Sequence, residues 1–104
     1  MAYQIEITPT ALEALEAITD QRTRTTIVRR IDALTSEPRT QGKALRGELA
    51  GFLSVRAAGQ RYRVVYRIDE SDKRVTVYLV GIRREGSRRD VYALAQRLVR
   101  RGLL

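Results

Sequence analysis

The segment from 61 to 68 alternates between arginine and apolar side chains, and this alternation limits the possible folds more than any other feature of the chain. Arginine occupies positions 61, 63 and 67, and the intervening apolar residues are Tyr62, Val64, Tyr66 and Ile68. Side chains on a strand point alternately to opposite faces of a sheet. The segment therefore predicts a strand in a sheet with one packed face and one arginine face. A cationic sheet surface attracts polyanions, and RNA is the first candidate.

The positive charge of the chain is confined to its second half. Residues 1–50 contain seven Arg or Lys and seven Asp or Glu, so their net charge is zero. Residues 51–104 contain thirteen basic and five acidic residues, which account for the entire net charge of +8. The one loop rich in turn residues, Ser36–Gly42, lies between the neutral part and the basic part.

Length and composition exclude several classes of site. A chain of 104 residues predicts one domain, spanning 1–104, with a core large enough to need no disulfide. Cysteine and histidine are absent from the sequence, which excludes thiol catalysis, Cys/His metal sites and any histidine acid/base pair. No apolar run approaches the ~20 residues needed to cross a bilayer, and no signal pattern opens the chain. We expect a cytoplasmic protein without a membrane segment, metal or cofactor.

Local signals divide the first half into a strand and two helices. Residues 3–7 alternate and predict a short strand. Thr8 before Pro9 is typical of a helix N-cap with proline in the first turn. Leu12, Leu15 and Ile18 then recur at helical spacing. Asp20 predicts the cap of a second helix, whose apolar stripe is Ile27, Ile31 and Leu34. The short connection predicts an antiparallel helical hairpin.

The second half predicts three strands and a final helix. The strands span 52–57, 61–69 and 74–82, and the short turns between them require antiparallel pairing. The third strand is apolar on both faces, with Val75, Val77 and Leu79 expected on one and Tyr78, Val80 and Ile82 on the other. A helix follows from Val91. The predicted order is β-α-α-β-β-β-α, an α+β fold with an antiparallel sheet packed against the N-terminal hairpin and the C-terminal helix.

Strand parity predicts which polar side chains share a surface. Arg61 and Arg67 belong on the face of Arg63, and Ser54 and Arg56 lie opposite the apolar Leu53 and Val55 of the preceding strand. The chain leaving the last strand adds further side chains at the sheet edge: Arg83, Arg84, Arg88, Arg89 and Tyr92. Arginine is planar and permanently charged and can grip a phosphate with two parallel hydrogen bonds. A solvated arginine face without function is the alternative, and the strand tyrosines are better explained as core residues than as base-stacking platforms.

At this point the sequence resembles a known family. The order of its elements and the order and spacing of four short motifs are similar to those of the RelE/ParE toxins of bacterial type II toxin–antitoxin pairs. The motifs are Lys43-Ala-Leu-Arg-Gly47, Tyr62-Arg-Val-Val-Tyr66, Gly81-Ile-Arg83 and Val91-Tyr92. The arginine-rich exit of the last strand and the later tyrosine resemble the RelE branch more than the ParE branch. The resemblance implies a toxin that cuts mRNA in the ribosomal A site without a metal and is held inactive by an antitoxin.

The resemblance also implies roles for single residues. Arg63 falls on an arginine that binds or polarises the scissile phosphate, and Arg83 on a phosphate binder proposed to protonate the leaving 5′ oxygen. Tyr92 matches a tyrosine that orients or stacks on the RNA, and Arg46 a basic residue that contacts nucleic acid. Ser54 and Arg56 stand where the best-known members have two lysines. Arginine does not readily release its proton, so the identity of the general base stays open.

The expected site therefore has two parts. The catalytic residues are Arg56, Arg63, Arg83 and Tyr92. The residues expected to contact RNA are Lys43, Arg46, Ser54, Arg61, Arg84, Arg88 and Arg89. We expect the guanidinium groups of Arg56, Arg63 and Arg83 to be solvent-accessible and close enough to grip one phosphate.

Three functions are consistent with these observations. The first is a ribosome-dependent mRNA endoribonuclease that works by 2′-hydroxyl attack, with the ribosome and mRNA as partners. The second is a ParE-like inhibitor of DNA gyrase, and the third is an inactive toxin-fold module that only binds RNA or its antitoxin. For the toxins, a basic chain predicts a cognate acidic antitoxin that folds on binding into a toxin–antitoxin hetero-oligomer.

Overall fold

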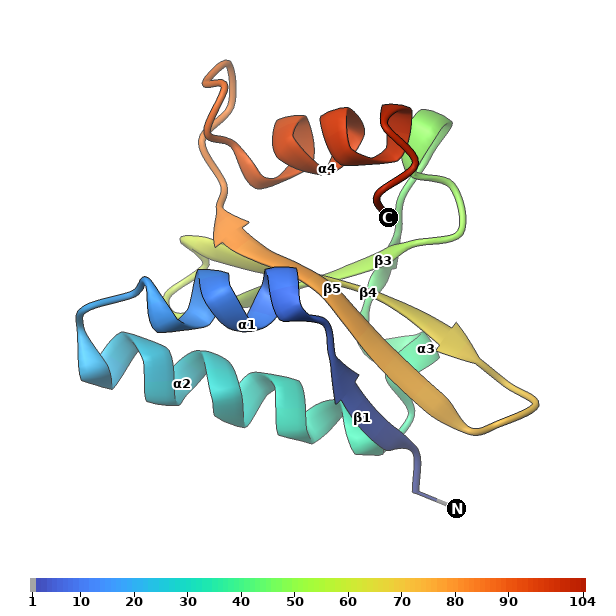
Figure 1. Ribbon diagram of the computed structural model, residues 1–104. Helices are drawn as coiled ribbons and strands as arrows, with labels where there is room; N and C mark the ends of the chain where they lie inside the picture. Colours follow the sequence, from blue (N-terminus) through green and yellow to red (C-terminus); the bar gives the residue numbers. More distant parts are fainter. Residues whose placement is uncertain (1) are drawn as a thin grey trace.

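A five-stranded sheet forms the centre of the computed structural model, which describes residues 2–104 (Figure 1). The strands lie in the order β1-β5-β4-β3-β2. The elements in chain order are β1 (Gln4–Ile7), α1 (Pro9–Glu16), α2 (Gln21–Asp32), η1 (Ala33–Thr35), α3 (Pro38–Gln41), β2 (Lys43–Ala44), η2 (Gly47–Leu49), β3 (Leu53–Ala57), β4 (Tyr62–Asp69), β5 (Arg74–Ile82) and α4 (Val91–Arg100). The α+β class and the predicted elements are confirmed, with four short additions, η1, α3, β2 and η2.

The helix starts follow the caps expected from the sequence. Thr8 Oγ1 accepts a hydrogen bond from the Ala11 backbone N–H at 3.2 Å, with Pro9 in the first turn of α1. Asp20 accepts from the backbone N–H groups at the start of α2, at 3.0 and 3.4 Å. These bonds satisfy donors that have no partner inside the helix. The N-terminal helical hairpin is confirmed.

The sheet is mixed, so the expectation of a purely antiparallel sheet is wrong at one edge. The β3-β4-β5 meander is antiparallel, as its short turns require. β1 pairs with β5 in parallel, with Gln4 opposite Arg74 and Ile7 opposite Val77. The reason is that only strands joined by a short turn have their relative direction fixed locally. β1 and β5 are separated by most of the chain.

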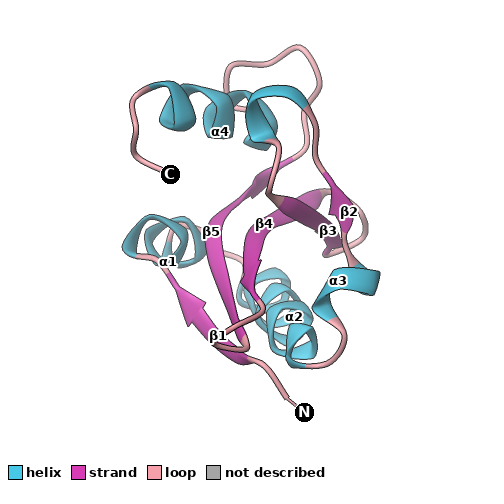
Figure 2. Cartoon of the chain, turned by 90° about the vertical axis from the view of Figure 1, so that its right-hand side faces the viewer, coloured by secondary structure: helices cyan, strands magenta, loops and turns pink. Residues whose placement is uncertain are grey.

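The opposite edge of the sheet is only partly covered (Figure 2). β2 pairs with β3 through Lys43 opposite Ser54 and Ala44 opposite Leu53. From Val55 onward, the outer edge of β3 has no neighbouring strand among residues 2–104. The single turn α3 lies in the predicted loop just before β2.

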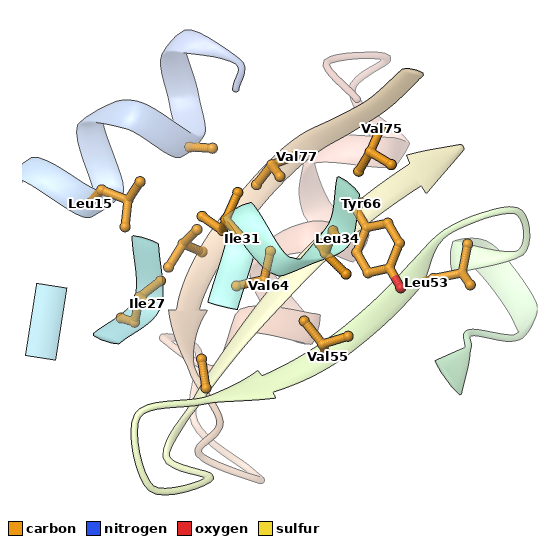
Figure 3. Packing of buried hydrophobic residues seen from close by; sticks show 13 residues of the cluster. Leu15, Ile27, Ile31, Leu34, Leu53, Val55, Val64, Tyr66, Val75 and Val77 are labelled. Carbon is orange, nitrogen blue, oxygen red and sulfur yellow. The ribbon is translucent and has the colours of Figure 1, made fainter. Parts of the chain in front are cut away.

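The larger core lies between the sheet and the helical hairpin (Figure 3). Leu15 of α1 and the α2 stripe pack against the inward-facing residues of β3, β4 and β5. Tyr66 belongs to this core, is fully buried, and donates its hydroxyl hydrogen to the Pro38 carbonyl oxygen at 2.6 Å. Burial raises the pKa of Tyr66 to about 12. Tyr66 is therefore a core residue, as expected.

A second, smaller core covers part of the face that the sequence assigned to arginine alone. The sheet lies between the α1–α2 hairpin and α4 (Figure 1). The buried residues of this core are Leu49, Phe52, Val65, Leu79, Val91 and Ala95. Val65 lies between Arg63 and Arg67 on β4 and packs toward α4, so the arginine face is interrupted by a packed patch.

An irregularity in the β4–β5 pairing explains a further difference from the predicted faces. Val65 pairs with Leu79 but Tyr66 pairs with Val77, so β5 contains one extra residue at this point. A bulge of this kind reverses the side-chain parity beyond it. Val77 consequently faces the helical hairpin while Leu79 faces α4, although alternation places them together.

No helix within residues 2–104 combines the length and the apolar character that crossing a membrane demands.

Candidate functional site

The outer edge of β3 opens onto a cavity of about 570 Å³ that contains most of the expected site residues. We call it the basic pocket. Six elements or the segments beside them contribute: α2, α3, β2, β3, β4 and the chain around the start of α4. Its lining residues are Arg30, Gln41, Lys43, Ser54, Val55, Arg56, Arg63, Arg83 and Tyr92.

The structure brings together all four expected catalytic residues and two of the residues expected to bind RNA, Lys43 and Ser54. The other five residues expected to bind RNA do not line the pocket. Arg46 precedes η2, Arg61 lies in the β3–β4 turn, and Arg84, Arg88 and Arg89 are exposed on the loop between β5 and α4. The packed patch also separates Arg67 from Arg63, and the Arg67 guanidinium stacks on Phe52, 4.8 Å from the ring centroid.

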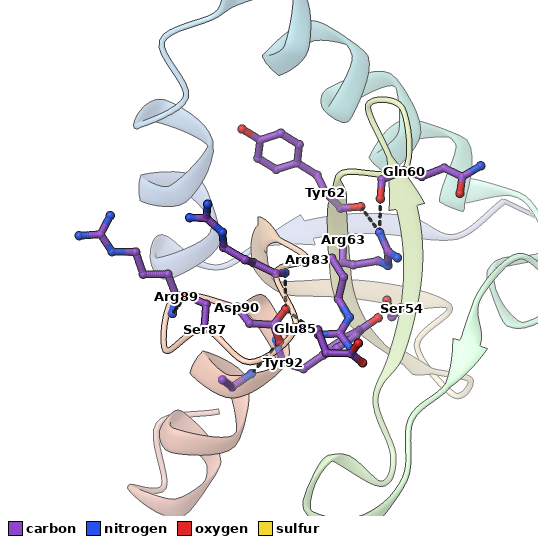
Figure 4. Close-up of polar contacts among 12 residues, drawn as sticks. Ser54, Gln60, Tyr62, Arg63, Arg83, Glu85, Ser87, Arg89, Asp90 and Tyr92 are labelled. Atoms are coloured by element: carbon purple, nitrogen blue, oxygen red, sulfur yellow. Dashed lines mark hydrogen bonds and ion pairs between the residues drawn. The ribbon is translucent and has the colours of Figure 1, made fainter.

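Arg56 and Arg63 form the centre of the pocket. They are directly opposite each other on β3 and β4, which places two like charges on one cross-strand pair. The Arg56 Nη1 donates to the Gln60 side-chain oxygen at 3.1 Å. The Arg63 Nη1 donates to the backbone oxygens of Gln60 at 2.5 Å and Tyr62 at 3.2 Å (Figure 4). The turn between the strands thus holds both guanidinium groups.

Neither arginine of this pair has a carboxylate partner among residues 2–104. Like charges directly opposite each other on a sheet destabilise it. An anion in the pocket would remove that repulsion. Arg56 and Arg63 are therefore unpaired with acidic residues in the part of the chain that is described, as expected, while their grip on a phosphate stays a prediction.

Arg83 departs from that expectation because two acidic residues bind it. Its Nη1 donates to Asp90 Oδ1 at 2.7 Å and its Nη2 to Glu85 Oε1 at 3.1 Å. The hydrogen bond to Asp90 raises the pKa of Arg83 further above its usual range. The Arg83 guanidinium also lies over the Tyr92 ring, 4.9 Å from its centroid. Arg83 is consequently a rigidly held arginine whose charge is balanced within the protein.

Asp90 links this arginine to the start of α4. The side chain is 4% exposed, and its Oδ1 also accepts from the Arg84 backbone N–H at 2.6 Å. Its Oδ2 accepts from the backbone N–H groups of Tyr92 and Ala93, at 3.0 and 3.3 Å, and so caps the helix. Burial works to raise the pKa of Asp90, but these hydrogen bonds hold it below its usual range. Asp90 was not among the expected site residues, although an aspartate just before an apolar helical run is a recognisable cap signal.

Tyr92 is fixed at its other end. Its hydroxyl and the Ser54 Oγ are 2.6 Å apart, and Ser54 is 5% exposed. The close approach of β5 to α4 depends on Gly81, where an added Cβ would lie 3.1 Å from the Val91 Cβ. The tyrosine therefore has a defined orientation at the wall of the basic pocket.

Two polar lining residues, Arg30 and Gln41, were not expected from the sequence. Arg30 follows Ile27 and precedes Ile31 on α2, and its side chain reaches the outer edge of β3, where its Nε donates to the Arg56 carbonyl oxygen at 3.2 Å. Gln41 ends α3 and accepts from the Arg30 Nη1 at 2.6 Å. Neither residue has a motif around it, and only the packing of α2 and α3 beside β3 brings them to the site.

Comparison with known proteins agrees with this arrangement. Residues 5–86 match the family described as "ParE toxin of type II toxin-antitoxin system, parDE". Toxin RelG of Mycobacterium tuberculosis is 34% identical over 89 residues, which cover 86% of this chain and 100% of RelG. The RelBE2 toxin–antitoxin complex from the same species includes a chain with 36% identity and a TM-score of 0.73, covering 80% of this chain and 93% of that one.

A more distant match agrees in fold over almost the whole chain. A mutant of Escherichia coli toxin RelE in the free state has a TM-score of 0.71 at 20% identity, covering 96% of this chain and 98% of that one. The bulk of both chains is thus built alike, including the region of α4. The family match and the mycobacterial relatives establish what the geometry and the motifs indicated: this chain belongs to the RelE/ParE family of toxins of type II toxin–antitoxin systems.

Proposed function

We propose that this toxin is an endoribonuclease that cuts mRNA on the ribosome, with the 2′ hydroxyl of the RNA as the nucleophile. The observation that carries the proposal is the basic pocket. It gathers Arg56, Arg63, Arg83 and Tyr92 from four separate segments, and two of these arginines have no carboxylate partner among the described residues. Such an arrangement is destabilising for the fold alone and favourable for binding a phosphodiester.

The reaction requires charge relief more than a protein nucleophile. The 2′ oxygen forms a bond to phosphorus while the bond from phosphorus to the 5′ oxygen breaks, which leaves a 2′,3′-cyclic phosphate and a 5′ hydroxyl. Arg56 and Arg63 would bind the two non-bridging oxygens as negative charge grows on them. Loss of one such preorganised donor typically costs about 100- to 1,000-fold in rate.

Arg83 and Tyr92 would act on either side of the reacting bond. Arginine has five N–H donors, and Arg83 uses two of its nitrogens for carboxylates, so further donors are available to the leaving 5′ oxygen. Tyr92 would hold the ribose or base, because its ring and hydroxyl are both fixed. The proton of the 2′ hydroxyl would pass to a water molecule, since an arginine retains its own proton.

The partners follow from the same surface. The ribosome would hold the message in line for attack, a contribution of positioning. We place this activity in the cytoplasm, where ribosomes translate. A cognate acidic antitoxin would neutralise the +8 chain in a hetero-oligomer, and the complex of the mycobacterial relative supports such a partner.

The test is to induce the chain without its antitoxin and to map RNA 5′ ends. We expect cuts in translated mRNA with 5′-hydroxyl ends, and loss of these cuts in Arg63→Ala. Arg67→Ala is the matched control, because it removes an arginine of the same strand that lies outside the basic pocket. Intact transcripts in cells that nevertheless stop growing would exclude the ribonuclease.

Inhibition of DNA gyrase is the second candidate, favoured by the family model's description as a ParE toxin. This function would need a protein-binding surface and no phosphate clamp. The same induced cells distinguish the two functions. Accumulated DNA breaks with whole transcripts would support the gyrase inhibitor, and cut transcripts with intact DNA would exclude it.

A further inference from the structure

Arg30 is an arginine held in place by neutral groups only. Its Nε donates to the Arg56 carbonyl at 3.2 Å and its Nη1 to the Gln41 Oε1 at 2.6 Å. No carboxylate within residues 2–104 lies at ion-pair distance from it. The side chain is partly buried and lines the basic pocket. Its full positive charge therefore faces the cavity without compensation.

Gln41 is itself locked, which fixes the position of Arg30. The Gln41 Nε2 donates to the carbonyl oxygens of Ala33 and Ser36, at 2.7 and 2.6 Å. Both bonds require the amide nitrogen to face α2 and η1, so the amide oxygen is left facing Arg30. An arginine with two of its donors occupied in this way keeps its remaining N–H groups for a ligand.

Lys43 lines the same cavity as Arg30. It is opposite Ser54 in the β2–β3 register and has an exposed side chain with no ion pair among the described residues. Arg30 binds the outer backbone edge of β3, whereas Arg63 belongs to β4 on the inner side. The pocket thus has cations on both sides of β3.

We propose that Arg30 and Lys43 form a second phosphate subsite of the basic pocket, which holds the phosphodiester next to the one that is cut. The inference rests on the proposed ribonuclease function. In this arrangement the RNA strand crosses the outer edge of β3, and the protein binds two successive phosphates. Among residues 2–104 no strand pairs with this edge from Val55 to Ala57, and Val55 and Arg56 line the cavity there.

A role for Arg30 in structure alone predicts different behaviour. If Arg30 only covered the open carbonyl of Arg56, its replacement would lower stability and leave the dependence of RNA binding on salt unchanged. A cation that binds a phosphate displaces counterions from the nucleic acid. Removing one such cation therefore lowers the log–log slope of affinity against salt by about 0.7 for single-stranded RNA. The salt slope distinguishes the two roles.

The first experiment measures binding of a fluorescent RNA hexamer with 2′-O-methyl riboses, which the toxin is unable to cut, across a salt series. We expect Arg30→Gln and Lys43→Gln each to weaken binding about fivefold and to lower the slope by about 0.7. Arg29→Gln is the matched control, because it removes the same charge from the adjacent position of α2, outside the basic pocket. A slope for Arg30→Gln and Lys43→Gln equal to that of Arg29→Gln would overturn the subsite.

The second experiment places a single uncharged methylphosphonate at each linkage of the hexamer in turn. The wild-type toxin should bind the hexamer less tightly when the methylphosphonate is at either of two adjacent linkages. The affinity of Arg30→Gln should be unchanged by a methylphosphonate at one of these linkages, and the affinity of Arg63→Gln should be unchanged by one at the other. Sensitivity of Arg30→Gln at both linkages would overturn the subsite while leaving the ribonuclease proposal intact. A toxin that binds no hexamer would overturn the subsite, and the mapping of RNA 5′ ends in induced cells would still decide the ribonuclease proposal.

Discussion

Asp90 offers the sharpest test of how the site is held together, because one carboxylate caps α4 and binds Arg83. Replacing it with alanine removes the cap and leaves the guanidinium without its buried partner. A missing N-cap costs about 0.5–2 kcal/mol, and a missing hydrogen bond to a charged group about 1.5–3 kcal/mol. We therefore expect Asp90→Ala to lower the free energy of unfolding by about 3 kcal/mol, or Tm by about 14 °C for a chain of this length.

Asp90→Asn separates the two roles. Asparagine is a good N-cap, so the start of α4 should persist while the charge pairing with Arg83 is lost. We expect about half of the alanine effect, about 1.5 kcal/mol. RNA cleavage should fall as well, because Arg83 loses the carboxylate that holds it in place.

The pH dependence of this difference follows from the lowered pKa of Asp90. The folded-state pKa lies below the unfolded value of about 3.9, so between the two the unfolded chain binds more protons. The contribution of the carboxylate is therefore complete above about pH 4 and is lost as the pH falls through the folded-state pKa. The difference in the free energy of unfolding between wild type and Asp90→Asn, which we call the stability gap, should be full at pH 7. It should decrease as the pH falls below about 4, since asparagine does not titrate.

Circular dichroism during thermal and urea unfolding at pH 7 and at low pH measures this gap. Glu85→Gln is the control, because it removes the exposed acidic partner of the same guanidinium and should leave Tm unchanged. Asp90→Asn as stable as wild type at pH 7, or a gap that stays constant down to about pH 2, would refute the reasoning.

Three further perturbations test the two cores and the pocket. Tyr66→Phe leaves the buried Pro38 carbonyl unpaired and should lower the free energy of unfolding in urea by about 1–2 kcal/mol. Because the folded-state pKa of Tyr66 is raised to about 12, the contribution of this phenol to wild-type stability should be full below about pH 10 and be lost as the pH rises to about 12. Gly81→Ala brings a Cβ against Val91 and should lower Tm by displacing α4, and an unchanged Tm would show that α4 does not pack as described. Arg56→Gln removes a like-charge cross-strand repulsion, so Tm should hold or rise while RNA affinity falls; a lower Tm would contradict that repulsion.

Most of the fold is encoded locally and could be predicted. Thr8 and Asp20 cap helices through contacts within a few residues, and the alternation of 61–68 specifies a strand whatever surrounds it. The direction of β1 and the bulge on β5 depend on pairing between distant segments. Val65 shows the limit of parity: a strand pattern identifies two faces, but only the position of α4 decides that this residue is buried beside two arginines.

The site was predictable to the same degree. Parity and the family resemblance found the residues on and just beyond the strands, including Arg56, Arg63 and Tyr92. They also placed Arg61 and Arg84 among the RNA contacts, because nothing local distinguishes an arginine facing the pocket from one on an exposed turn. Arg30 was missed since it belongs to the first, neutral half of the chain and reaches the pocket only when α2 packs beside β3.

The parallel pairing of β1 with β5 affects when the basic pocket is completed during synthesis. Proteins are made from the N-terminus, and β1 has to wait for Arg74–Ile82 before its edge is paired. Contacts between residues so far apart form late in folding. The wall made by Arg83, Asp90 and Tyr92 is synthesised later still. A ribosome that stalls, or a transcript broken before the codon for Tyr92, therefore yields a chain without a finished pocket. The order of elements completes the pocket only after Tyr92 has been synthesised, so we expect a copy that ends before Tyr92 to lack the activity proposed above.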